Sequence, residues 1–228
     1  MKLIIAAIVL AVSCLAGINA GPAPAHGFAS LPAPFQAQVF TVVEDMIHLG
    51  EETAKALVHQ YEEIVVEPHQ QLEEAIDNIE ARRAESPQCV ASQDDEINAI
   101  LDTVHEEMHD CTVVAAHTSA EIATDVNQAT QQLVFGGLSL GRTYNKCQNY
   151  KNSVLKQSCM AKFYIQATVY LVQARSSIKT IKQSTNERIP AVFVEGNVCT
   201  HNAADEAVNG LNEVNRSIDV CVAKKLRH

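Results

Sequence analysis

Hydrophobic residues recur at steps of three and four along most of the chain, a spacing that places side chains on one face of an α-helix. The pattern begins at Phe35 and is interrupted by Pro68. Proline lacks an amide hydrogen and its ring crowds the preceding turn, so it should break or kink the segment near Glu67. The pattern therefore predicts two consecutive helices, over about 35–66 and 69–85.

Ser86-Pro87 interrupts the helical pattern again, and the most regular spacing of hydrophobic residues follows it. Ser92 with the acidic residues after it is a suitable helix start, because a hydroxyl and carboxylates stabilise the unpaired amides there. Glycines should end this helix at Gly136-Gly137 and Gly141. We expect a further helix over about 143–186, a loop over 189–196 and a last helix over 201–225.

The expected helix over 143–186 carries its apolar residues at Tyr144, Cys147, Val154, Leu155, Ile165, Val169, Val172 and Ile181. No segment shows the two-residue alternation typical of half-buried strands. The chain is therefore predicted to be all-α, a disulfide-bridged helical bundle of about four to five helices.

The N-terminus has the layout of a secretory signal peptide, with Lys2, an apolar run over 3–15 and small residues up to Ala20. Cleavage is expected after Ala20. The alternative is a membrane anchor, but the run is shorter than the roughly 20 residues that span a bilayer. We expect a signal peptide at 1–20, a flexible Pro/Ala-rich leader at 21–34 and one helical domain at 35–228, with no membrane span.

Removal of the signal peptide would remove Cys14 and leave six cysteines: Cys89, Cys111, Cys147, Cys159, Cys199 and Cys221. An even number in a secreted chain predicts three disulfides, for which 15 pairings are possible. No two of the six have the CxxC spacing of zinc ribbons or thioredoxin-like redox sites.

One pairing follows from an internal similarity. The segments 89–111 and 199–221 have equal length, and both fit C-x5-D-E-x4-L-x2-V-x6-C. Two parallel helices with matching offsets would join Cys89 to Cys199 and Cys111 to Cys221. Cys147 would then pair with Cys159, which requires a helix break between them, near 148–153.

Charge is distributed unevenly along this acidic chain, whose formal net charge is −10. Residues 41–110 contain 19 acidic and three basic residues, whereas 141–188 contain nine basic residues and Glu187 alone. The acidic half argues against general nucleic-acid binding. The favoured interpretation is a basic helix packed between acidic ones, and the alternative is a basic face that meets an anionic surface.

The sequence His105-Glu106-Glu107-Met108-His109 matches the HExxH pattern of zinc metallopeptidases, in which two histidines share a metal and the glutamate polarises its water. Acidic residues crowd this segment, and Val104 and Met108 hold the core stripe. That places His105 and His109 on the flank, and no third ligand follows at metzincin spacing. We expect a solvated helix face with no catalytic zinc, His105 and His109 being weak metal candidates only.

No other pattern predicts catalysis. The letters of G-x-S-x-G occur at 137–141, but the glycine-rich stretch 133–141 around them lacks the strand context of a nucleophile elbow and the GK[ST] of a phosphate loop. We expect no catalytic residue and no cofactor. Asn215-Arg216-Ser217 is a glycosylation sequon, which makes Asn215 a candidate site.

The six-cysteine helical pattern over Gln88–Cys221, with stretches such as CQNYKNSVLKQSCMAKFYIQA, resembles the insect secreted domain found in the tsetse EP protein. The resemblance implies an extracellular, non-enzymatic protein linked to gut or body-fluid defence. The glutamate-proline repeats of the namesake do not occur in these 228 residues, so no role tied to them is implied.

We therefore expect a secreted, non-enzymatic interaction protein that meets an extracellular macromolecule or surface. The first alternative is a carrier of hydrophobic ligands such as lipid, in which the stapled bundle encloses or opens to the ligand. The remote alternative is a zinc metallopeptidase that uses the HEEMH motif.

Overall fold

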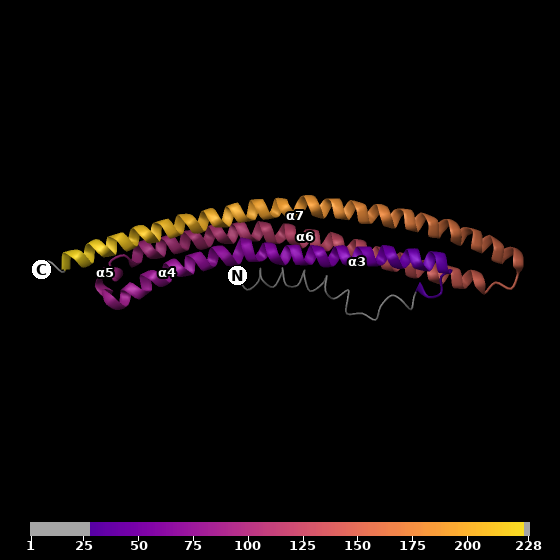
Figure 1. Cartoon of the computed structure of the whole chain (residues 1–228), viewed down its shortest axis with the longest axis horizontal. Coiled ribbons are helices and arrows are strands. Elements are labelled where there is room, and N and C mark those ends of the chain that lie inside the picture. Colours follow the sequence, from indigo (N-terminus) through magenta and orange to yellow (C-terminus); the bar gives the residue numbers. More distant parts are fainter. Residues whose placement is uncertain (1–27, 226–228) are drawn as a thin grey trace. The chain divides into compact units, whose positions relative to one another are not determined.

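The structure, a computed structural model, describes residues 28–225. The regular elements in that range are α3 (Ala33–Tyr61), the π-helical η2 (Glu62–Val66), α4 (Glu67–Glu85), α5 (Pro87–Ala91), α6 (Asp94–Gln148) and α7 (Ser153–Lys225) (Figure 1). The predicted all-α, disulfide-bridged fold is confirmed. The predicted signal peptide 1–20 and the leader up to residue 27 lie outside the described residues.

The described chain forms two compact units. Unit 1 comprises residues 58–118 and 190–225, and unit 2 comprises residues 28–57 and 119–189. Helices α6 and α7 each contribute residues to both units. The single domain over 35–228 stays a prediction.

The core of unit 1 is made by α4, α5, the first part of α6 and the last part of α7 (Figure 1). Leu211, Val214 and Ile218 of α7 are fully buried and pack at the helical spacing predicted for the last helix. Arg82 of α4 reaches α7, where its guanidinium forms an ion pair with Asp219 and donates to the backbone oxygen of Asn215 at 3.1 Å. Apolar packing and this charged contact together hold α4 against α7.

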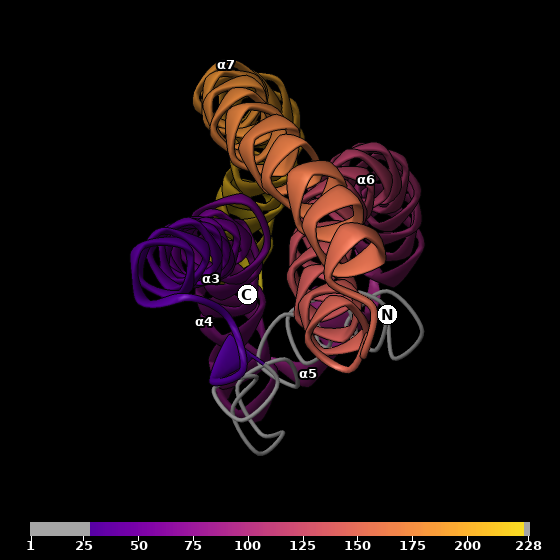
Figure 2. The same cartoon turned by 90° about the vertical axis from the view of Figure 1, so that its right-hand side faces the viewer.

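The core of unit 2 is richer in aromatic side chains and is built from α3, α6 and α7 (Figure 2). Phe163 of α7 is fully buried, with ring centroids at 5.2 Å from Tyr144 and 5.8 Å from Phe35. Phe28 and Leu31, which precede α3, are buried in the same core. Packed chain therefore begins before Phe35, inside the stretch that the Pro/Ala-rich composition assigned to a leader.

The predicted irregularity at Pro68 takes the form of a π-helical turn. Helix α3 ends at Tyr61, the turn η2 follows, and α4 begins at Glu67 with Pro68 in its first turn. Helical backbone precedes Pro68, so the amide hydrogen that proline lacks costs one backbone hydrogen bond. In the π turn the Glu67 amide donates to the Glu62 carbonyl, five residues earlier. One π turn absorbs the disruption, so the chain passes the proline without leaving helical geometry.

The glycines at 136, 137 and 141 do not end a helix, because α6 continues to Gln148. A Cβ atom on Gly136 would lie 2.6 Å from the Tyr170 ring, and one on Gly137 would lie 2.7 Å from the Phe28 ring. No described glycine has a positive φ. Gly136 and Gly137 therefore serve the close approach of aromatic rings inside unit 2, and their role is packing.

The predicted loop over 189–196 is also wrong, since α7 runs unbroken from Ser153 to Lys225 and contains Pro190. The chain there keeps a helical packing pattern: Val192 is buried, and Gly196 fits against Ile64 and Ala115. Pro190 itself is exposed, where the loss of one backbone hydrogen bond disturbs no buried contact. Burial on both sides of the proline outweighs its helix-breaking tendency.

All six cysteines form disulfides, but the predicted parallel ladder is wrong. The structure joins Cys89 to Cys221 and Cys111 to Cys199. The pair Cys147–Cys159 is as predicted, and the helix break that it requires lies at 149–152. Within unit 1 the first cysteine pairs with the last, so the matching 22-residue spacings form antiparallel rungs.

None of the helices between residues 28 and 225 has an apolar stretch long enough to cross a bilayer. The three disulfides are consistent with an oxidising compartment.

Candidate functional site

The HEEMH segment lies on α6 in unit 1, where its apolar members hold it to the core. Val104 and Met108 are buried, whereas His105, Glu106 and His109 are exposed. The two histidines are one turn apart and therefore share a helix face, as the spacing predicts. The histidines and Glu106 of the motif therefore face solvent, on the side of α6 away from its buried stripe.

A groove runs along this surface between the η2–α4 segment and α6. Its volume is about 750 Å³, and its lining includes Tyr61, Val65, Val66, Met108, Thr112, His69, Gln70, Glu73, His105, Glu106 and His109. The ring nitrogen Nδ1 of His69 lies 2.8 Å from the Val65 carbonyl, which fixes the ring orientation. Burial raises the pKa of the Tyr61 phenol above its usual value. The groove combines an apolar floor with imidazole and carboxylate edges.

Three histidines line this groove, yet they do not form a metal centre. Among residues 28–225, no three His, Cys, Asp or Glu side chains are grouped closely enough to hold a metal ion. The structure therefore brings His105 and His109 to one surface without completing a site around them.

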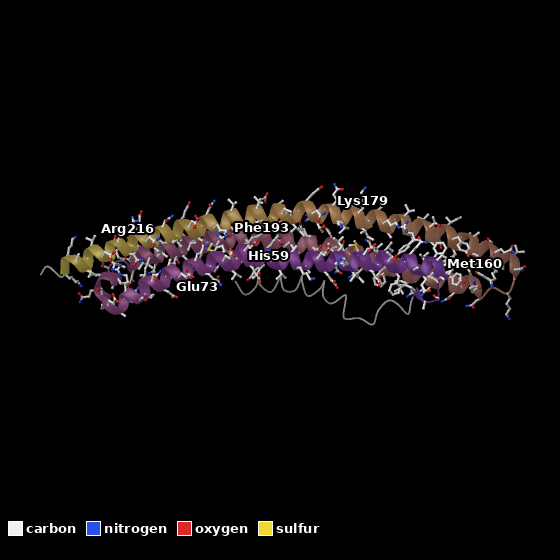
Figure 3. All side chains as sticks on the ribbon, viewed as in Figure 1. His59, Glu73, Met160, Lys179, Phe193 and Arg216 are labelled. Atoms are coloured by element: carbon white, nitrogen blue, oxygen red, sulfur yellow. A yellow bond between two sulfur atoms is a disulfide. The ribbon has the colours of Figure 1, made fainter. Side chains whose placement is uncertain are left out.

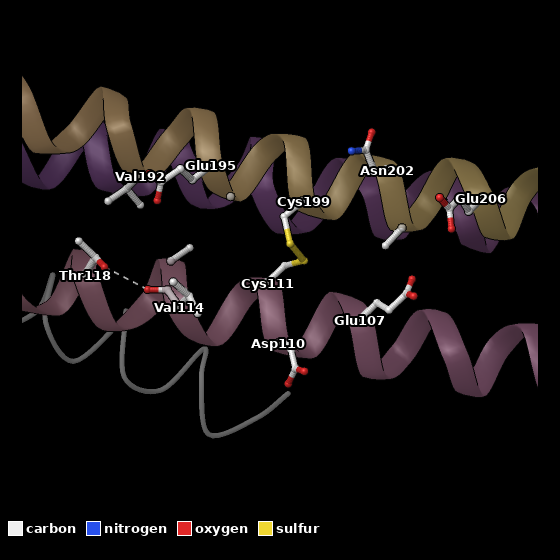
Figure 4. A pocket seen from close by; sticks show the side chains of 13 residues that line it. Glu107, Asp110, Cys111, Val114, Thr118, Val192, Glu195, Cys199, Asn202 and Glu206 are labelled. Atoms are coloured by element: carbon white, nitrogen blue, oxygen red, sulfur yellow. Dashed lines mark hydrogen bonds between the residues drawn. A yellow bond between two sulfur atoms is a disulfide. The ribbon is translucent and has the colours of Figure 1, made fainter.

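A second hollow, of about 610 Å³, surrounds the Cys111–Cys199 bridge between α6 and α7 in unit 1 (Figure 4). Four carboxylates reach its rim, those of Glu107, Asp110, Glu195 and Glu206. Both sulfur atoms are consumed by the disulfide, so no thiolate is present to act as a nucleophile. The hollow is therefore an acidic depression around a structural disulfide.

The most unusual surface belongs to the first part of α7, in unit 2. We call it the α7 outer face and define it by nine exposed residues: Val154, Ser158, Ala161, Lys162, Ile165, Val169, Val172, Ser176 and Lys179. The side chains of Val154, Ile165 and Val172 are 71%, 65% and 63% exposed. Contiguous exposed aliphatic side chains of this kind mark interaction surfaces, whereas single exposed aliphatic residues are common on any protein.

Helical geometry explains why these residues face outward. The buried residues of the same stretch are Phe163, Ala167, Leu171 and Ala174. Ile165, Val169 and Val172 each lie two positions from one of them, which on an α-helix is a rotation of about 200°. The first part of α7 therefore has two apolar faces, of which only one packs in the unit 2 core.

The charges on this part of α7 all have the same sign. Residues 153–186 contain no Asp or Glu and five basic residues, Lys156, Lys162, Arg175, Lys179 and Lys182. Lys162 and Lys179 form no ion pair with any residue between 28 and 225. Lys179 points away from the neighbouring helices (Figure 3). The outer face thus carries uncompensated positive charge between aliphatic side chains.

The favoured interpretation of the charge pattern, a basic helix paired with acidic neighbours, holds for Arg188. Its guanidinium bonds Asp125 at 2.7 Å and Glu121 at 3.1 Å, both on α6. The lysines of the outer face do not follow it. The charge asymmetry instead distinguishes the two units. Unit 1 is acidic, with 20 acidic and five basic residues over 58–118 and 190–225. Unit 2 is slightly basic, with seven acidic and ten basic residues over 28–57 and 119–189.

The sequence pattern placed Val154, Leu155, Ile165, Val169 and Val172 on the apolar stripe of their helix, and the structure exposes all five. Periodicity alone could not choose between the two apolar faces. The absence of carboxylates from 153–186 was the available signal, because a solvent-facing stretch of this length usually mixes both charges.

Asn215, the predicted glycosylation candidate, is half-buried on α7 of unit 1. Its backbone oxygen accepts from Arg82, so this part of α7 faces α4. Glycosylation of Asn215 stays a prediction.

A protein-family model matches residues 85–205, a stretch that begins just before Cys89 and ends after Cys199. No curated protein and no solved structure matches the chain. The matched stretch is more than half of the 228 residues and includes α5, all of α6 and α7 as far as residue 205. The chain therefore belongs to the family described as "Protein of unknown function (DUF725)".

Proposed function

We propose that this chain is a secreted, non-enzymatic interaction protein that binds microbial surfaces in a gut or body fluid, and that the α7 outer face makes the contact. The observation that carries the proposal is the exposed aliphatic stripe over Val154–Val172, set among unpaired cations. Microbial envelopes are predominantly anionic, so charge complementarity draws this face of an otherwise acidic protein toward them. The three disulfides support persistence outside the cell.

The finer family assignment is part of the same proposal. The family match over 85–205 falls almost wholly within Gln88–Cys221, the stretch whose cysteine framework resembles the tsetse EP domain. Assignment to that insect family would fit a role in gut or body-fluid defence. The proposal transfers no catalytic residue with it.

Binding to intact bacteria tests the proposal. We expect fluorescently labelled protein to sediment with washed Gram-negative and Gram-positive cells, and the variant Ile165→Ser/Val169→Ser/Val172→Ser to lose at least nine-tenths of that binding. The matched control is Val114→Ser/Val194→Ser/Val198→Ser, which removes three exposed valines of unit 1 and should bind like the original protein. Failure of the original protein to bind cells, or equal binding by the outer-face variant, would refute the proposal.

A carrier of hydrophobic ligands is the second candidate, and the groove beside the HEEMH segment favours it. Val65, Val66 and Met108 supply an apolar floor, and a volume of about 750 Å³ suits a small lipid-like molecule. A ligand in this groove would lie against Met108 and Thr112 of α6. A carrier would retain its ligand through purification.

A zinc metallopeptidase is the remote candidate and rests on His105, Glu106 and His109. The exposed position of all three disfavours it, because metal-bound water needs a shaped, partly dry site to act as a nucleophile. Such an enzyme would lose peptidase activity on Glu106→Gln. We expect neither the original protein nor this variant to cleave peptides.

Mass spectrometry of the native secreted protein separates these candidates. We expect a chain that starts at Gly21 and contains three disulfides, with no stoichiometric lipid or zinc. One bound lipid per chain would favour the carrier. One zinc per chain that disappears on His105→Ala/His109→Ala would favour the metallopeptidase.

A further inference from the structure

We infer that the partner of the α7 outer face is the surface of an anionic phospholipid bilayer, on which the first part of α7 lies without crossing it. This inference rests on the proposed function and names the chemistry that the face recognises. Its starting point is the combination of aliphatic side chains and cations on one exposed helix face, the pattern of helices that lie in a membrane interface.

The aliphatic side chains identify an apolar phase as part of the partner. Val154, Ile165 and Val172 are each more than three-fifths exposed, and Ala161 and Val169 complete the stripe. A soluble polyanion such as a sulfated glycan offers charge but no apolar phase, so it would leave this stripe in water. The acyl boundary of a bilayer accepts such side chains while the helix axis stays parallel to the surface.

The cations identify the headgroups. Lys162 and Lys179 lie on the stripe itself, and Arg175 and Lys182 follow on its flank, all four exposed. Lysine can bury its aliphatic stem beside an apolar surface while its ammonium group stays in the headgroup layer. Because residues 153–186 contain no carboxylate, no negative charge on this stretch opposes an anionic lipid.

The geometry of the face argues against pairing with the same face of a second copy. Such a pair would bring Lys162 and Lys179 of each chain together, with no carboxylate between residues 153 and 186 to neutralise them. The acidic unit 1 of a second copy remains a competitor by charge, and the experiment below separates it.

The distribution of charge between the units makes docking one-sided. Unit 1, with 20 acidic and five basic residues over 58–118 and 190–225, would be repelled by an anionic membrane. Unit 2 carries the surplus of cations, and its α7 segment carries the aliphatic stripe. Among residues 28–225, an anionic bilayer should therefore select the α7 outer face.

Cosedimentation with vesicles tests the inference, using the full secreted chain. We expect binding to vesicles of phosphatidylcholine with 30% phosphatidylglycerol and no measurable binding to phosphatidylcholine alone. Each cation near an anionic membrane contributes about fivefold in affinity, so Lys162→Gln/Lys179→Gln should weaken binding by about 25-fold. Raising the salt concentration from 0.1 M to 1 M shortens the screening length from about 10 Å to about 3 Å and should release most of the protein.

Two further variants separate apolar insertion from simple attraction. Ile165→Ser/Val169→Ser/Val172→Ser keeps every cation and should weaken binding by about tenfold or more, because the apolar contact is lost. The control Val114→Ser/Val194→Ser/Val198→Ser should bind unchanged. All substituted residues are exposed, so the variants should keep the original far-ultraviolet circular dichroism.

Several results would overturn the inference. Equal binding to both vesicle types, or an unchanged affinity of the Lys162→Gln/Lys179→Gln variant, would remove the charge argument. Binding to bacteria that depends on the outer face, with no vesicle binding, would leave the proposed function standing and assign the face to a protein or glycan. Sedimentation of the free protein as a dimer that the outer-face variants abolish, again with no vesicle binding, would assign it to a second copy. Loss of both cell and vesicle binding would refute both proposals.

Discussion

Replacing Phe163 with alanine should lower the free energy of unfolding by about 3–5 kcal/mol, the usual cost of removing a fully buried aromatic ring from a packed core. Phe163 is completely buried in unit 2 and is surrounded by the rings of Phe35, Tyr144 and Tyr164 at centroid distances of 5.8, 5.2 and 5.4 Å. Edge-to-face and tilted ring contacts at these distances add to the burial energy. No small rearrangement of three aromatic rings can fill the space that the ring would leave.

The measurement is denaturant unfolding followed by circular dichroism at 222 nm. The matched control is Ile165→Ala, two residues away on the opposite face, where 65% exposure limits the expected change to about 0.5 kcal/mol. Equal destabilisation by both substitutions would mean that the two apolar faces of α7 have been interchanged. That result would remove the α7 outer face as a binding surface as well.

The same experiment tests the predicted single domain. Because α6 and α7 each contribute to both units, we expect one transition, and Phe163→Ala should shift all of it. Two transitions, of which only one moves, would show instead that the units unfold independently and that 35–228 is two domains.

The sequence predicts helices reliably where one apolar face is unambiguous. The spacing over 35–85 located α3 and α4 and the irregularity at Pro68, because the helix stripe there is continuous and only one residue opposes it. The start of α6 near Ser92 also followed from local chemistry. These are short-range effects, in which each residue interacts with positions three or four away.

The features that the sequence did not predict depend on partners far along the chain. Gly136 and Gly137 lie inside α6, where Tyr170 and Phe28 pack onto them, and neither partner is identifiable from the glycines themselves. Pro190 lies within a helix because burial on either side holds it there. In both cases tertiary packing overrides a local propensity of about 1–3 kcal/mol.

The candidate site was half visible from the sequence. The excess of cations after residue 141 and the possible basic face were evident, but the aliphatic residues between those cations were assigned to the core. A helix whose apolar residues alternate between two opposite faces has no single stripe for periodicity to detect. Only the aromatic cluster around Phe163 establishes which face packs and which is left for a partner.

Removing the Cys89–Cys221 bridge should be the most costly change to unit 1, lowering the free energy of unfolding by about 4 kcal/mol. These cysteines are 132 residues apart, but the Cys111–Cys199 bridge inside the loop shortens the ring that they close to roughly 46 residues. In the chain-entropy account, the closed ring reduces the conformational entropy of the unfolded chain. The resulting stabilisation grows with the size of the ring. The comparison is Cys147–Cys159, whose separation of 12 residues predicts about 3 kcal/mol.

Double serine variants measured by denaturant unfolding provide the test, with Cys89→Ser/Cys221→Ser set against Cys147→Ser/Cys159→Ser. A peptide map of the original protein is its control, since the expected order of stabilities depends on the antiparallel pairing. The second pair lies beside the turn at 149–152, where the chain already holds its ends close, so its removal should also leave vesicle binding by the α7 outer face intact. A map that joined Cys89 to Cys199 and Cys111 to Cys221 would instead show the parallel ladder that the sequence predicts. It would contradict the antiparallel rungs of unit 1, because both bonds would then link cysteines at matching rather than opposite ends of the two 22-residue spacings.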